Sequence, residues 1–300
     1  MTQAVWRSPL LPLQKQSRSS SAQAQSDIGT GGRFKRDLLT YLKAYGPRKT
    51  GGLVQQLTRY DFDQIRAALV ASVPSKQHLA GLDSDVGTLW GWPALKDLMG
   101  RIPTQRPKDD SGGQAHIVAQ QLQYMRPHLC RWAGDDSNYV DLSEDTPTKY
   151  EAGRGRAAPH IKTYIRFADR NKMDSIDWAL VTSANLSTQA WGAATNPSGE
   201  VRISSWEIGV AVWPDLFSDA SARGHERGAP GSANALMVPC FKKDQPDSIP
   251  NHLDSQGQTT VVGFRMPYDL PLTPYRASDE PWCATATHHL PDWQGQSWIS

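Results

Sequence analysis

The sequence places an imidazole and an ammonium two residues apart in a segment that has the composition of a β-strand. His160 and Lys162 lie in the segment HIKTYIR, residues 160–166. Because side chains alternate along a strand, both lie on one face, about 7 Å apart, and the opposite face is apolar enough to be buried. An imidazole exchanges a proton near neutral pH and an ammonium neutralises an anion, so the pair is suited to phosphodiester chemistry.

A second predicted strand, residues 178–182, is nearly all apolar and is therefore expected in the centre of a sheet. It runs into SANLS, residues 183–187, whose Ser and Asn are typical of a helix N-terminus. We expect the helix to continue to Trp191 and to end at Gly192. A helix N-terminus offers backbone N–H groups and partial positive charge to an anion, so this segment predicts a phosphate site.

Each of these two patterns alone has an ordinary structural interpretation, since a lone His-x-Lys is usually a solvated strand edge and SANLS alone is an N-cap. Together, HIKTYIR and VTSANLSTQAWG closely resemble the second catalytic motif of the tyrosyl-DNA phosphodiesterases, a branch of the phospholipase D superfamily. The resemblance continues through four further segments and covers most of the chain. They are SPLLPL at 8–13, FKRDLLTYLKAYG at 34–46, SSWEIGV at 204–210 and MPYDLPLTPY at 266–275.

The resemblance implies a two-step mechanism in which two His-x-Lys motifs, one from each half of the fold, face each other. The histidine of the first half attacks phosphorus and forms a phosphohistidine. By match to the second motif, His160 would protonate the departing tyrosine oxygen and then activate water. Lys162 and Asn185 would hold the phosphate oxygens. The family pattern implies no metal and no cofactor.

Other residues near these motifs are also assigned by the resemblance. Glu207 matches an acidic residue that could orient an imidazole, although a surface carboxylate at a strand start is an equal alternative. Ser183 and Ser187 are predicted to contact DNA together with Lys162 and Asn185. The implied partners are single-stranded or 3′-end-modified DNA and a covalently linked peptide derived from a topoisomerase. A monomer in the nucleus is expected.

The implied fold is α/β, a phospholipase D-like mixed sheet flanked by helices on both faces. We expect residues 1–60 to be a poorly packed remnant of the N-terminal domain and residues 61–300 to form the C-terminal domain. Apolar patterning predicts helices at 33–45, at 52–58 and from about 93, strands at 65–73, 205–212 and 259–264, and irregular structure over 218–258. The resemblance additionally implies a strand at 116–120 and a separate helix that ends near residue 132.

Composition limits these expectations without deciding them. The net charge is only +2, so nucleic-acid binding would need a local basic cleft. The three cysteines are widely spaced, which favours a reducing compartment and argues against a zinc site. No apolar run approaches the roughly 20 residues that span a bilayer.

The sequence departs from the family pattern in one respect, because His160 is the one histidine of eight that is followed two residues later by Lys. The nucleophile-bearing first motif is therefore expected to be missing, from a truncated gene model, a splice form or a degenerate copy. Loss of a nucleophile costs about 10⁴–10⁶-fold in rate, so little activity is expected. Two alternatives remain: a homodimeric single-motif nuclease, and a non-catalytic single-stranded DNA-binding module in which Trp178 or Trp206 stacks on bases.

Overall fold

The protein is described from a computed structural model. It describes residues 5–14, 27–81, 84–104, 126–131, 150–154, 160–218, 235–246, 260–276, 279, 281, 286–291 and 294–299. The chain forms two compact units, residues 1–107 with 159–265 and residues 108–158 with 266–300. Every candidate site residue belongs to the first unit.

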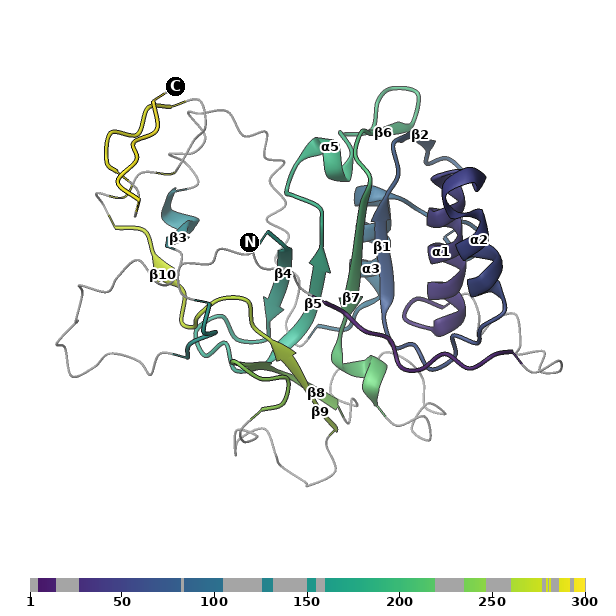
Figure 1. Ribbon diagram of the computed structural model, residues 1–300, viewed down its shortest axis with the longest axis horizontal. Helices are drawn as coiled ribbons and strands as arrows, with labels where there is room; N and C mark the ends of the chain where they lie inside the picture. The colour runs from purple at the N-terminus through teal and green to yellow at the C-terminus, as the bar shows by residue number, and fades with distance from the viewer. Residues whose placement is uncertain are drawn as a thin grey trace. The chain divides into compact units, whose positions relative to one another are not determined.

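The first unit is organised around a four-stranded sheet (Figure 1). Its strands are β1 (Ala68–Ser72), β7 (Glu207–Val212), β5 (Ile176–Thr182) and β4 (Lys162–Phe167), in the spatial order β1-β7-β5-β4. All three pairings are antiparallel. As predicted, the apolar strand β5 is central, and the strand that begins at Lys162 lies beside it at the sheet's outer edge.

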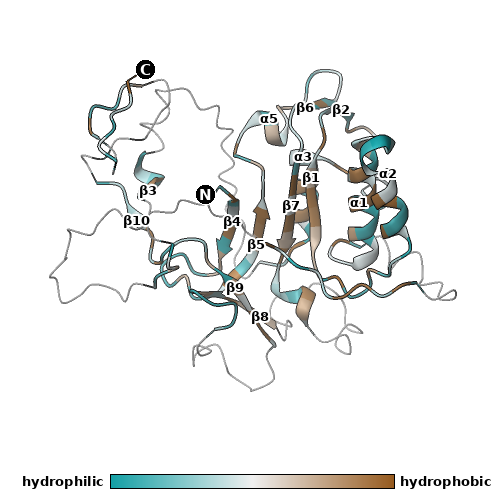
Figure 2. Ribbon diagram, in the orientation of Figure 1, coloured by the Kyte–Doolittle hydropathy of each residue, from teal (hydrophilic) through white to brown (hydrophobic). Residues whose placement is uncertain are grey.

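Helices cover both faces of this sheet, because neighbouring residues of β1 point to opposite sides. Helix α1 (Gly31–Ala44) packs Tyr41 against Ala71 on one side. On the other side, helix α3 (Gly91–Arg101) packs Leu98 against Val70. The predicted α/β fold with helices on both faces is confirmed, and the apolar colouring of β1, β5 and β7 is visible in Figure 2.

Helix α1 agrees closely with the predicted helix at 33–45. The Thr30 hydroxyl accepts the Arg33 N–H at 3.3 Å, which caps the helix start, and Gly46 with φ of 97° follows its end. Helix α2 (Pro47–Thr58) follows at once and packs on α1 with no buried residue of its own. It begins five residues before the predicted start at 52 because Pro47 is favourable at the first helical position.

Two short ladders complete the first unit. The antiparallel pair β2 (Ser75–His78) and β6 (Glu200–Ile203) was not predicted, since these short segments carry mostly polar residues. The parallel pair is β8 (Ala235–Cys240) with β9 (Thr260–Arg265), and the 3₁₀ turn η3 (Pro214–Phe217) precedes it. The expected mixture of parallel and antiparallel pairing is therefore present, but it is divided between separate sheets.

Strand β8 corrects the prediction that residues 218–258 are irregular. Its first four residues, Ala235–Val238, are all apolar and buried, but Pro239 then breaks the strand pattern. Proline is tolerated where no ladder partner needs its N–H, and a two-stranded ladder offers such a position.

The second unit contains the 3₁₀ turn η2 (Arg126–His128) and a two-stranded ladder of β3 (Cys130–Arg131) with β10 (Thr273–Pro274). The predicted helix ending near residue 132 is therefore wrong over 126–131. There the turn contains Pro127, which cannot donate a helical hydrogen bond. The predicted strand at 116–120 lies outside the described residues.

Within residues 1–60, helix α1 is well packed, contrary to the expectation for this region, whereas Val5 and Leu10 are exposed. Phe34 and Tyr41 of α1 are 4% and 5% exposed and pack against residues of β1 and its neighbours. The compact units do not divide at residue 60, so the assignment of residues 1–60 to a partner-domain remnant remains a prediction. No helix in the described ranges is both long and apolar enough to cross a membrane.

Candidate active site

The register of the sheet brings the two predicted motifs together. Lys162, the first residue of β4, pairs with Thr182, the last residue of β5, and Thr182 pairs in turn with Gly209 of β7. The loop of residues 183–187 starts immediately after Thr182. His160 precedes β4 by two residues, at the same end of the sheet, where helix α5 (Thr188–Trp191) also lies (Figure 1).

Backbone and side-chain hydrogen bonds fix the loop that carries Asn185. The Thr182 hydroxyl accepts the Ala184 N–H at 3.1 Å, and the Ser183 N–H donates to the Ile208 carbonyl of β7 at 3.0 Å. The Asn185 carbonyl accepts the Ser187 N–H at 2.8 Å. These bonds leave the Asn185 side chain exposed on a loop with a defined conformation.

Helix α5 confirms the predicted helix end but not the predicted anion site. Ser187 is its N-cap and accepts the Ala190 N–H at 3.3 Å, and Gly192 follows Trp191 with φ of 97°. The helix is one turn of four residues. A macrodipole is a sum over aligned peptides, so a helix of this length contributes little charge at its start.

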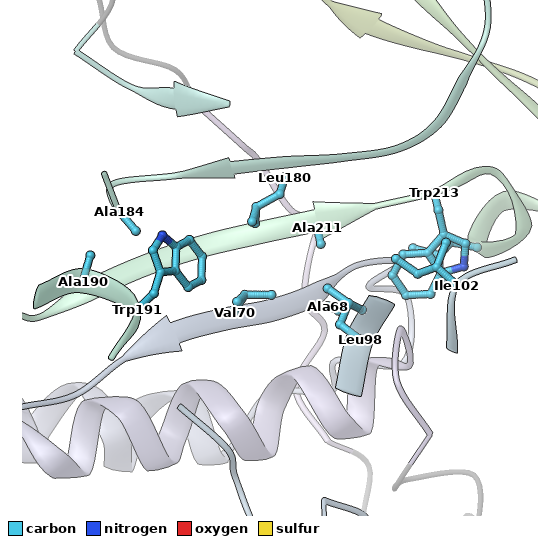
Figure 3. Close-up of a cluster of buried hydrophobic side chains, with 11 residues drawn as sticks. Ala68, Val70, Leu98, Ile102, Leu180, Ala184, Ala190, Trp191, Ala211 and Trp213 are labelled. Atoms are coloured by element: carbon cyan, nitrogen blue, oxygen red, sulfur yellow. The ribbon is translucent and has the colours of Figure 1, made fainter. Parts of the chain in front are cut away.

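Apolar packing anchors the loop and α5 to the sheet. Trp191, 7% exposed, belongs to one buried cluster with Ala184, Leu180, Val70 and Leu98 (Figure 3). Ala184 of the loop and Trp191 of α5 are thus both packed into this buried cluster. Core packing therefore acts together with the hydrogen bonds of the loop to set its position relative to β5 and β1.

The three side chains expected to contact phosphate are available for a ligand. His160 and Asn185 are exposed and Lys162 is half-buried. Within the described residues, none of these side chains has a hydrogen-bond or ion-pair partner. All six residues of β4 are half-buried, and Tyr164, on the same face as Lys162, also packs on the core. The aromatic ring supplies the apolar area that the charged neighbours lack.

Glu207 and Ser183 are already bonded to each other. The Ser183 hydroxyl donates to Glu207 Oε2 at 2.5 Å and accepts the Ile208 N–H at 3.1 Å. In the described contacts, Glu207 therefore holds the loop and not the His160 imidazole. The predicted DNA contacts of Ser183 and Ser187 remain predictions, since both hydroxyls have structural partners here.

Sequence reasoning assigned no role to Tyr164, which the structure bonds to the loop of Asn185 and to Trp191. Its hydroxyl donates to the Ala184 carbonyl at 3.2 Å and accepts the Trp191 indole N–H at 3.4 Å. The available signal was its position two residues after Lys162 on the same strand face. The partners themselves, 20 and 27 residues away, could not be read from local sequence.

Neither of the two described pockets contains a candidate residue. A surface pocket of about 740 Å³ is lined by residues 7–11 with Gln56, Leu57 and Tyr60. A narrow one lies between α1 and α3. The candidate site is an open edge of the sheet. In the described part of the chain, no group of three or more His, Cys, Asp or Glu side chains could hold a metal ion.

A family model described as tyrosyl-DNA phosphodiesterase matches residues 1–121 and 114–276 of this chain. The chain belongs to this family. The second matched segment contains His160, Lys162, Asn185 and Glu207. Membership in the tyrosyl-DNA phosphodiesterase family thus covers both strands and the loop that form the site.

Named relatives agree with the family assignment. A probable tyrosyl-DNA phosphodiesterase of Schizosaccharomyces pombe is 27% identical over 93% of this chain and 59% of its own length. Tyrosyl-DNA phosphodiesterase 1 of Arabidopsis thaliana is 30% identical over 69% of this chain and 31% of its own. The chain thus spans less than two thirds of these relatives. A crystal structure of yeast tyrosyl-DNA phosphodiesterase aligns with a TM-score of 0.46 at 18% identity, covering 93% of this chain and 68% of that one.

Proposed function

We propose that the whole protein hydrolyses the phosphodiester joining the 3′ end of DNA to a tyrosine, and that this chain supplies the acid/base half of the active site. The names of the family and of its relatives refer to a phosphodiester between tyrosine and DNA. Repair of 3′-end adducts left by topoisomerases, in the nucleus, is the setting that we propose.

The observation that supports this function best is the pairing of Lys162 with Thr182. It sets the first residue of β4, Lys162, beside the start of the loop of Asn185, and His160 precedes Lys162 by two residues at the same end of the sheet. All three side chains lack partners within the described residues, so they can bind a phosphate without first breaking internal bonds. Binding then costs less reorganisation than in a site whose groups are already paired.

The proposed chemistry proceeds in two displacements at phosphorus. In the first, a nucleophilic imidazole forms a nitrogen–phosphorus bond, the bond to the tyrosine oxygen breaks, and protonated His160 gives its proton to that oxygen. In the second, His160 takes a proton from water, whose oxygen bonds to phosphorus while the nitrogen–phosphorus bond breaks. The products are a 3′-phosphate and free tyrosine, and His160 ends in its starting state.

Lys162 and Asn185 would stabilise the charge on the non-bridging oxygens. The ammonium has three N–H donors and the carboxamide has two, so both can follow the oxygens as the phosphorus centre changes geometry. Since the 300 residues contain one His-x-Lys, we propose that the attacking imidazole comes from outside this chain. We expect the chain by itself to cleave at least about 10⁴-fold more slowly than a complete site.

Binding is therefore the first test. A single-stranded oligonucleotide ending in 3′-phosphotyrosine, labelled at its 5′ end, is titrated with the chain by fluorescence anisotropy. Lys162→Ala should weaken binding by about fivefold and reduce the slope of log K against log salt by about 0.7. Lys172→Ala is the matched control, because Lys172 is an exposed lysine in the turn after β4. Absence of binding by the wild-type chain at low salt would contradict the proposal.

The role of His160 is tested with two leaving groups. An oligonucleotide 3′-(4-nitrophenyl) phosphate releases an acidic phenol that needs no proton donor, whereas the tyrosyl ester does. His160→Ala should lose the slow cleavage of the tyrosyl ester and retain release of nitrophenol, followed at high enzyme concentration. Equal loss with both esters would show that His160 is not the acid.

The same experiments separate the alternatives. Binding without cleavage of either ester would favour a single-stranded DNA-binding module. That function finds little support from aromatic side chains, since Trp178 packs against the core and the Trp206 ring stacks on Tyr45 at 4.0 Å. A homodimeric nuclease would require dimers in sedimentation, with cleavage rising as the square of the chain concentration.

A further inference from the structure

Tyr164 connects β4, the strand that begins at Lys162, to the loop of Asn185. It lies two residues after Lys162 on β4 and pairs in register with Leu180 of β5. Its ring meets the Trp191 indole edge to face, with centroids 5.9 Å apart and planes at 86°. Because the ring is packed against the buried cluster, the position of its hydroxyl is set by the core.

The hydroxyl holds the peptide group that leads into Asn185. It donates at 3.2 Å to the Ala184 carbonyl, and that carbonyl belongs to the peptide bond whose nitrogen is that of Asn185. It also accepts the Trp191 indole N–H at 3.4 Å. The one proton of the phenol is therefore committed to the loop, and it is not available to a substrate.

Electrostatics keep this phenol in its donating form. Burial raises the pKa of Tyr164, the Glu207 carboxylate raises it further, and the bond from Trp191 opposes them. A neutral phenol retains the O–H that the Ala184 carbonyl needs. The phenol therefore keeps this bond at neutral pH.

The other described side-chain bonds onto this loop come from different strands. Thr182 of β5 bonds the Ala184 N–H, and Glu207 of β7 bonds Ser183. Among the described contacts, the Tyr164 hydroxyl is the one side-chain bond to this loop from β4, the strand that begins at Lys162. Without it, the loop would still be bonded to β5 and β7, but no side-chain bond would fix its distance from Lys162 on β4.

We propose that Tyr164 is a positioning residue whose hydroxyl sets the Asn185 carboxamide against the Lys162 ammonium so that both grip one phosphate. This inference rests on the proposed function. It predicts that the hydroxyl affects ligand binding through Asn185 and has little effect on binding once the Asn185 side chain is removed.

The test is a double-mutant cycle with the 3′-phosphotyrosyl oligonucleotide. Tyr164→Phe keeps the packed ring and removes only the hydroxyl, and should weaken binding by about fivefold, the value of one neutral hydrogen bond. In an Asn185→Ala background the same change should have no further effect, because the contact through which it acts is gone. Tyr60→Phe, a half-buried tyrosine remote from this loop, is the control and should bind as the wild type does.

The outcomes distinguish the inference from the function on which it rests. Additive effects of Tyr164→Phe and Asn185→Ala would indicate a purely structural role and overturn the inference. So would wild-type affinity in Tyr164→Phe when Asn185→Ala binds weakly. Absence of binding by the wild-type chain would instead overturn the proposed function. Thermal unfolding of each variant by circular dichroism checks that the fold persists.

Discussion

The Ser183 hydroxyl links two strands at the candidate site by donating to Glu207 Oε2 at 2.5 Å and accepting the Ile208 N–H at 3.1 Å. Both partners belong to β7, whereas Ser183 begins the loop that follows β5. The start of the loop is thereby tied to β7, just as Tyr164 ties its next peptide group to β4. The loop of Asn185 is therefore held from both neighbouring strands.

Removing this link should loosen the loop without unfolding the sheet. Ser183→Ala deletes both hydrogen bonds, and since the pair is solvent-exposed we expect a loss of only about 1 kcal/mol in the free energy of unfolding. Urea denaturation measures this loss. Ser198→Ala, an exposed serine in the turn before β6, should change stability by less than about 0.5 kcal/mol. Equal stability of the two variants would refute a role for the link.

A side chain at Gly209 should disrupt the pairing of β7 with β5, at the position where Thr182 also pairs with Lys162. A Cβ there would lie 2.6 Å from the Thr182 Cβ and 3.0 Å from the Val181 carbonyl oxygen. Gly209→Ala is therefore expected to cost about 2 kcal/mol, since neither the strand backbone nor its β-branched partner can move freely.

The matched control for that change is Gly52→Ala in α2. Nothing lies within 4 Å of a Cβ at this position, and alanine favours a helix, so stability should rise by about 0.5–1 kcal/mol. Opposite signs for the two glycine changes in chemical denaturation are the expected result. Stabilisation by Gly209→Ala would mean that the described strand contact is wrong.

The buried cluster beneath the site predicts a large effect at Leu180. This side chain is fully buried and lies opposite Tyr164. Leu180→Ala should destabilise the protein by about 3 kcal/mol through lost burial and a residual cavity. Leu186→Ala, at a leucine 72% exposed in the neighbouring loop, should cost less than about 0.5 kcal/mol in the same urea titration.

Asp215 of η3 provides a pH-dependent prediction. Burial raises the pKa of its carboxyl above the ordinary 3.8. A raised pKa in the folded state means that the contribution of this group to stability is full at low pH and is lost as the pH rises through the folded pKa. Asp215→Asn should therefore match the wild type well below pH 3.8 and be more stable than it at neutral pH.

Thermal unfolding of both proteins from acid to neutral pH measures this difference. A difference that is constant with pH would mean that the carboxyl is not perturbed and that the substitution acts by packing. Asp174→Asn, at a half-buried aspartate before β5, is a suitable comparison at each pH.

Local pattern was sufficient to predict the elements that carry the chemistry. The 3–4 spacing of Phe34, Leu38 and Tyr41 identified α1, and the apolar run ending at Thr182 identified β5 as central. Strand β2 escaped prediction because its four residues are polar, and β6 because its alternation of Val201 and Ile203 with charged residues spans only four residues.

The residues of the candidate site could be predicted from the sequence, but the hydrogen bonds that position them could not. His160, Lys162 and Asn185 were recognisable from motif spacing, and the sheet register places them at one end of β4 and β5. The bonds of Tyr164 to Ala184 and Trp191, and of Ser183 to Glu207, join residues far apart in sequence. Such contacts depend on how strands align, which no local pattern encodes.

The place of β4 at the border of the four-stranded sheet has a consequence for colloidal behaviour. A border strand exposes backbone donors and acceptors that can template pairing with another chain, and charged side chains discourage such pairing. Lys162 would then serve solubility as well as phosphate recognition. Light scattering should show Lys162→Ala to be more prone to self-association than Lys162→Arg, which retains the charge while altering the shape of the cation.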